Sequence, residues 1–197
     1  MEEKNAKVGR TIAVFAIVLG IVLVIAMMVK GFGENSDYKS DSLAKKTYHD
    51  HGLTFTYPGN YVVSSDEEED GVLDVVCEIK GSDISQIEIS AASIPEMEYS
   101  QEDIAEICEA SLEGIRDHFR NMAIYRNVVV GDIRKGTLGK YPCYQRDIRI
   151  SILSVTSNGV AKVAVTDTGK LLVVVEVAEN DQYMKTLQAI EQSIKIQ

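Results

Sequence analysis

The feature that most constrains this sequence is a charge-free run from Thr11 to Val29, built almost entirely from aliphatic residues. It matches the roughly 20 apolar residues that cross a bilayer as a helix, the structure that satisfies its own backbone in hydrocarbon. A buried core helix would carry a polar stripe, and a cleaved signal peptide would have a shorter apolar stretch before a small-residue cleavage site. The sequence therefore predicts an uncleaved, single-pass transmembrane helix over residues 11–30.

Basic residues next to this run predict its orientation. Lys4, Lys7 and Arg10 precede it closely, whereas the basic residues beyond it are more dispersed. Positive residues flanking a membrane helix favour the cytoplasmic side. We therefore expect a cytoplasmic tail over residues 1–10 and an extracytoplasmic C-terminal domain. The sequence lacks Asn-x-Ser/Thr acceptors, which fits a bacterial envelope.

The remainder divides into a linker and one domain. Residues 31–46 are polar, without apolar periodicity, and predict a linker. Residues 47–197 are long enough for one well-buried core. The net charge of −10 argues against a nucleic-acid partner, because such proteins present basic faces.

Apolar periodicity predicts an α+β domain. Alternating or β-rich stretches indicate strands over residues 53–57, 61–64, 72–79, 87–91, 144–153, 160–166 and 171–177. A helix is predicted after Ser100, which with Asp103 resembles a capping box. Its apolar face would hold Ile104, Ile107, Cys108, Leu112, Ile115 and Phe119, opposite a stripe of Glu102, Glu106, Glu109 and Glu113. A second helix should begin near Asn180 or Asp181 and bury Tyr183, Leu187, Ile190 and Ile194.

The domain resembles the PsbP/Mog1-like superfamily. The segment from Leu53 to Tyr61 contains Phe55 and Pro58 at the spacing of that superfamily's opening motif. The strand entry from Gly139 to Tyr144, the late hairpin and the C-terminal helix follow the same order. The resemblance implies an αβα sandwich around a mostly antiparallel sheet, often tethered to bacterial membranes outside the cytoplasm. It supplies no catalytic residues.

The acidic run from Asp66 to Asp70 is one candidate metal site. Asp66, Glu68, Asp70 and Gly71 match the start of a calcium loop. The bidentate Glu required at the twelfth position is missing, because Cys77 stands there. We therefore expect a solvated hairpin tip.

The His49-Asp50-His51 segment is the other candidate. In an extended segment it would place two imidazoles on one side, but zinc needs three or four ligands. His118 lies on the predicted helix, with no pattern that brings it near. We therefore expect surface histidines, no metal site and no cofactor.

The cysteines and the motif inventory argue against catalysis. Cys77, Cys108 and Cys143 lie in apolar surroundings and predict buried free thiols, with one disulfide as the alternative. We find no nucleophile elbow, Walker A loop or dinucleotide-binding glycine motif.

We therefore expect no catalytic residues and a non-enzymatic binding domain, whose partner is an envelope protein or a small apolar ligand between helix and sheet. The alternative is a hydrolase assembled from scattered His, Cys and carboxylate residues.

Overall fold

The computed structural model describes residues 44–197 except 70, 80–83, 95–98, 123–124 and 153–154. The expected cytoplasmic tail, the transmembrane helix and all but residues 44–46 of the linker lie outside the described residues. Among the helices that are described, none combines the length and apolarity needed to cross a membrane.

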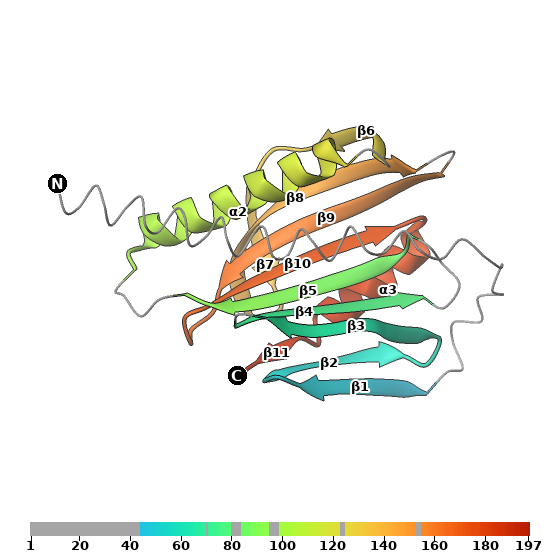
Figure 1. The fold of residues 1–197 in the computed structure, drawn as a ribbon, viewed down its shortest axis with the longest axis horizontal. Coiled ribbons are helices and arrows are strands. Elements are labelled where there is room, and N and C mark those ends of the chain that lie inside the picture. The colour runs from blue at the N-terminus through green and yellow to red at the C-terminus, as the bar shows by residue number, and fades with distance from the viewer. Residues whose placement is uncertain (1–43, 70, 80–83, 95–98, 123–124, 153–154) are drawn as a thin grey trace.

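The described strands form two antiparallel sheets (Figure 1). The small sheet has the order β1-β2-β11, with β1 at Lys45–Asp50, β2 at Leu53–Pro58 and β11 at Lys195–Ile196. The large sheet has the order β3-β4-β5-β10-β9-β8-β6, and β7 pairs with β8. Its strands are β3 Tyr61–Glu69, β4 Val72–Ile79, β5 Gln86–Ser93, β6 Tyr125–Val130, β7 Arg134–Leu138, β8 Tyr141–Ile152, β9 Val155–Val165 and β10 Lys170–Ala178.

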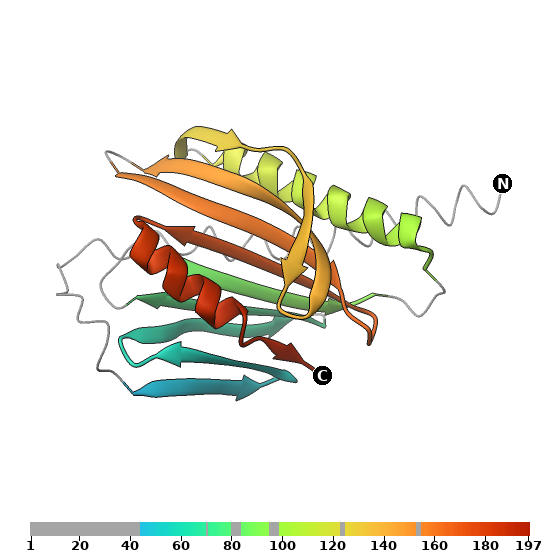
Figure 2. The same cartoon turned by 180° about the vertical axis from the view of Figure 1, so that it is seen from behind.

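Two helices cover opposite faces of the large sheet (Figures 1 and 2). Helix α2 (Gln101–Asn121) packs on β6, β8 and β9, and α3 (Asp181–Glu191) packs on β10 and β2. Side chains of β10 alternate between the two faces: Val173 joins the core under α2, and Leu172 joins the core under α3. This arrangement confirms the expected α+β class with a mostly antiparallel sheet.

The capping box of α2 is present as predicted. The Ser100 Oγ accepts a hydrogen bond from the backbone N–H of Asp103 at 3.1 Å, and an Asp103 carboxylate oxygen accepts the backbone N–H of Ser100 at 2.9 Å. The apolar face buries Cys108, Leu112, Ile115 and Phe119, whereas Ile104 and Ile107 are only partly buried.

Replacing Ser100 by alanine should destabilise the domain by about 1 kcal/mol, because it leaves an N-terminal backbone donor of α2 without its acceptor. Urea unfolding of residues 44–197 measures this change, with Gln101→Ala as the exposed neighbouring control. A difference between the two variants near zero would contradict a stabilising cap.

Three sequence-based boundaries differ from the structure. Helix α3 ends at Glu191, so Ile194 lies beyond the helix although it still joins the core. Residues 66–69, expected in a hairpin tip, continue strand β3 because their backbones pair with β4 as far as Val72. Strand β1 begins at Lys45, before the end of the expected linker, and β1, β6, β7 and β11 had no counterparts among the predicted strands.

Candidate functional site

The turn between β1 and β2 has an unusual backbone conformation. Its two residues, His51 and Gly52, have φ angles of 46° and 75°. Two consecutive positive φ values are typical of the type I′ turns that join two-residue hairpins. Glycine adopts this conformation freely, whereas a histidine there is uncommon. The turn brings the imidazole of His51 to strand β3.

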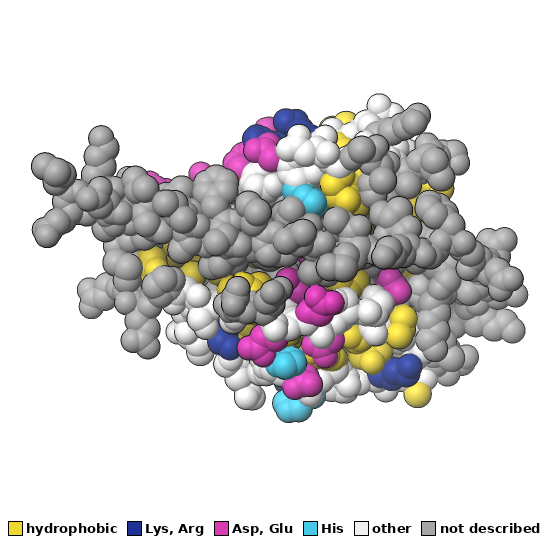
Figure 3. All heavy atoms as spheres, viewed as in Figure 1, with side chains coloured by type: hydrophobic (Ala, Val, Ile, Leu, Met, Phe, Trp, Pro, Cys, Tyr) yellow, Lys and Arg dark blue, Asp and Glu magenta, His cyan; other side chains and the backbone are white. Residues whose placement is uncertain are grey.

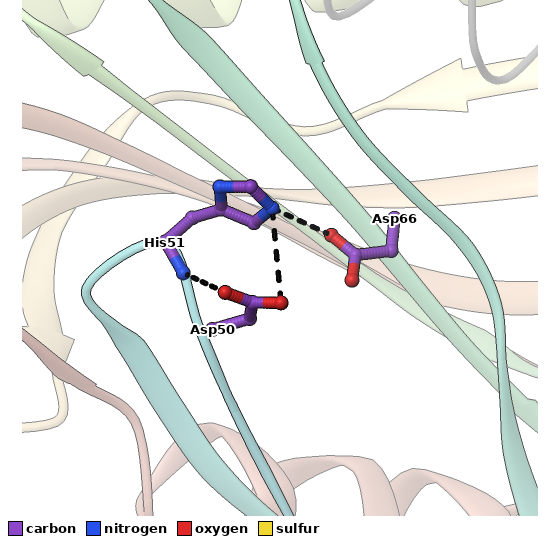
Figure 4. Close-up of side chains that lie close together, drawn as sticks. All are labelled: Asp50, His51 and Asp66. Atoms are coloured by element: carbon purple, nitrogen blue, oxygen red, sulfur yellow. Dashed lines mark hydrogen bonds and ion pairs between the residues drawn. The ribbon is translucent and has the colours of Figure 1, made fainter.

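Three carboxylates surround this imidazole, and Figure 4 shows two of them, those of Asp50 and Asp66. The Nδ1 atom lies 2.6 Å from Glu68 Oε2. The Nε2 atom lies 3.9 Å from Asp50 Oδ2 and 3.9 Å from Asp66 Oδ1. We call Asp50, His51, Asp66 and Glu68 the hairpin cluster.

Further hydrogen bonds fix two of the carboxylates. The hydroxyl of Tyr48 donates to Asp66 Oδ1 at 2.8 Å, and the backbone N–H of His51 donates to Asp50 Oδ1 at 2.8 Å. Burial and the hydrogen bond to Asp66 raise the pKa of Tyr48, so this hydroxyl stays protonated. The cluster is therefore held by β1, β3 and the turn.

The hairpin cluster is acidic and accessible to solvent. Asp and Glu side chains gather around histidines on the side of the molecule that carries β1 to β3 (Figure 3). The side chain of His51 is 35% exposed. Within the described residues, the ion pairs of Asp50, Asp66 and Glu68 involve His51, and none of them involves Lys or Arg. Such a surface favours cations over anions.

The two histidines singled out in the sequence have different partners. His51 lies in the turn with the carboxylates, whereas His49 lies in β1, where its Nδ1 is 2.7 Å from the Thr54 hydroxyl. His118 lies on α2, half-buried against Phe119, and burial lowers its pKa. The structure therefore does not pair His49 with His51, and the sequence contained no signal that His51 meets Asp66.

The acidic run does not form a calcium loop in the described residues. As a strand, it sends Asp66 and Glu68 toward His51, while Glu67 lies opposite Asp74 of β4. Cys77, at the position that would need the bidentate ligand, is fully buried. The described part of the acidic run is therefore an extended strand, and its backbone does not curve around a central ion as a calcium loop does.

All three cysteines are free and buried. Cys77 and Cys143 belong to the core under α3, and Cys108 to the core under α2. Burial raises the pKa of Cys77 and Cys108 to about 12 and that of Cys143 to about 11. Since the thiolate is the reactive form, these thiols are poor nucleophiles.

The glutamate stripe of α2 is mostly solvent-facing. Glu102, Glu106 and Glu109 are exposed, whereas Glu113 is partly buried and forms ion pairs with Arg116 and Arg146. Arg146 is buried and also donates to backbone carbonyls of Leu112 and Gly131, so this end of the stripe has a structural role.

A shallow hollow of about 430 Å³ lies beside α3. Residues of β6, β8, β9 and α3 line it, including Val129, Arg149, Asn158, Val160, Met184 and Gln188. Its described lining contains no histidine or cysteine. The described side chains that line the hollow offer both apolar and charged contacts to a partner, but they do not include a cysteine or histidine that could act as nucleophile or base.

Comparison with known proteins identifies the fold. No known family and no curated protein sequence matches this chain. Cyanobacterial PsbP (CyanoP) from Synechocystis is similar in structure, with 17% identity and a TM-score of 0.55, over 85% of this chain and 99% of that one. A crystal structure from Bacteroides thetaiotaomicron has 10% identity and a TM-score of 0.51, over 78% of this chain and 48% of that one.

A third structure is LpqN, involved in cell envelope biogenesis of Mycobacterium tuberculosis, with 13% identity and a TM-score of 0.43 over 79% of this chain and 92% of that one. The likeness to PsbP confirms the fold that the sequence resemblance implied. At these identities the comparisons show the fold alone.

Proposed function

We propose that this protein is a non-enzymatic accessory domain of a bacterial envelope, anchored by one transmembrane helix and acting by binding. The observation that carries this proposal is the PsbP-like fold behind the charge-free run from Thr11 to Val29. The N-terminus would be cytoplasmic and the domain extracytoplasmic, as the basic residues before the run favour.

The placement of reactive groups supports binding rather than catalysis. Nucleophilic catalysis needs an accessible nucleophile activated by an oriented base. The three thiols are buried and have raised pKa values, and His51 is surrounded by carboxylates. His49 contacts the Thr54 hydroxyl on an exposed hairpin, but no described carboxylate orients its other ring nitrogen.

The hollow beside α3 is the binding surface that we favour. Val129, which lines this hollow, is 60% exposed and is the most exposed large apolar residue described, and Met184 adds a flexible apolar contact. Its shallow form suits a segment of another envelope protein better than an enclosed apolar ligand.

Protease treatment of intact cells tests the topology. With tags at both ends of the full chain, external protease should remove the C-terminal tag and leave the N-terminal tag protected. Changing Leu19 and Val22 to arginine should move the protein out of the membrane fraction, because charges at the centre of a membrane helix are unfavourable. The matched control changes the same residues to isoleucine.

Two results would contradict this proposal. A C-terminal tag that resists protease until the membrane is broken would reverse the orientation. Turnover of ester, peptide or phosphate substrates by the purified full chain, lost in His49→Ala or Thr54→Val, would favour the hydrolase alternative.

A further inference from the structure

We propose that Asp50, His51 and Asp66 form a binding site for a divalent transition-metal cation, with Zn²⁺ as the probe. The proposal goes beyond the envelope function and does not depend on it. The ligand atoms of these three residues lie within 4.8 Å of one another. They come from the turn, from the end of β1 and from β3.

The spacing around Nε2 suits an ion better than a direct hydrogen bond. Two carboxylate oxygens lie 3.9 Å from this nitrogen, beyond the usual limit of about 3.2 Å for such hydrogen bonds. Ligand atoms about 2.0–2.2 Å from a tetrahedral ion are roughly 3.4 Å apart. Small side-chain rotations would therefore bring all three atoms into coordination distance.

The surrounding hydrogen bonds orient each ligand as metal sites require. A ligating histidine usually donates its other ring N–H to a carboxylate, which leaves the first nitrogen free to bind metal. Here Glu68 lies 2.6 Å from Nδ1. Tyr48 donates to Asp66, and the backbone of His51 donates to Asp50. Glu68 is therefore a positioning residue, and Nε2 faces the two carboxylates.

Charge and donor type indicate the class of cation. Three carboxylates without a described Lys or Arg partner repel one another, and a divalent ion would offset that repulsion. Calcium and magnesium prefer all-oxygen ligand sets, whereas imidazole nitrogen favours zinc and its transition-metal neighbours. Three protein ligands would leave at least one coordination position to water.

Calorimetric titration of the full chain in detergent with zinc chloride tests the site. One equivalent should bind at neutral pH. His51→Asn should weaken this binding at least tenfold, and asparagine tolerates the left-handed backbone of the turn. Asp66→Asn should have a similar effect while retaining an oxygen that accepts from Tyr48. The matched control is His49→Asn on the same hairpin, which should bind zinc as the unchanged protein does.

Other outcomes would overturn the proposal. No zinc binding up to millimolar concentration would leave His51 as an ion-pair partner of the carboxylates. Equal losses in His49→Asn and His51→Asn would indicate a His-x-His site instead. Calcium binding as tight as that of zinc, and unaffected by His51→Asn, would indicate a carboxylate site. Each variant should keep the circular dichroism spectrum of the unchanged protein, so that a loss of zinc binding reports the loss of a ligand and not unfolding.

Discussion

Replacing Lys162 by methionine should lower the free energy of unfolding by about 3–5 kcal/mol. The Lys162 Nζ lies 2.5 Å from Glu191 Oε2 beneath α3, and their side chains are only 13% and 4% exposed. Removing the lysine leaves the Glu191 carboxylate buried without its cation. This carboxylate also lies in the last turn of α3, where the helix dipole disfavours negative charge.

A double variant distinguishes the loss of the ion pair from the loss of packing. Lys162→Met combined with Glu191→Leu removes both charges, and apolar replacement of a buried pair is often neutral or stabilising. The double variant should therefore recover most of the loss. Lys185→Met, an exposed lysine on α3, is the control and should change stability by less than about 0.5 kcal/mol. A double variant no more stable than the single one would contradict this account.

Elements with local signals were predicted best. The cap of α2 depends on residues three apart, and the β9–β10 hairpin on two apolar runs around a short turn. Strand β1 was not predicted, because all but one of its side chains are exposed and it therefore has the composition of a linker. Strand β11 has two residues and exists only through its pairing with β2.

The hairpin cluster could not be predicted, because it depends on contacts across two sheets. Tyr48 of the small sheet meets Asp66 of the large one, and the turn carries His51 to the same place. Each segment, taken alone, lacked the ligands that a metal site needs. By contrast, Lys162 and Glu176 did leave a signal in the sequence, because each is a charged residue within an apolar stretch of its strand.

Glu176 itself should make the domain less stable as pH rises. This residue of β10 is fully buried, and its carboxyl group lies beside that of Glu191, which can accept a hydrogen bond from Glu176 only when Glu176 is protonated. Burial, and then the charge of Glu191, raise its pKa to about 8, while Lys162 partly opposes the shift. The thiol of Cys143 under the same helix has a raised pKa, so it adds no charge near neutrality.

The sign of the effect follows from proton binding. Between the ordinary glutamate pKa of about 4.3 and the folded value, the folded chain retains a proton that the unfolded chain releases. Stability from this group is therefore full below the unfolded pKa and is lost as pH rises through about 8. Each pH unit in that interval contributes up to about 1.4 kcal/mol.

Glu176→Gln should remove this dependence, because glutamine resembles the protonated glutamate in shape and has no charge to bury. Relative to the unchanged protein, the variant should gain about 4 kcal/mol in unfolding free energy between about pH 5 and pH 9. Urea unfolding of both proteins across that range measures the difference, which cancels contributions from other buried acids such as Glu88. Glu109→Gln, exposed on α2, should leave the pH profile unchanged. Parallel profiles for Glu176→Gln and the unchanged protein would mean that Glu176 is already ionised in the folded state, held by Lys162 rather than protonated.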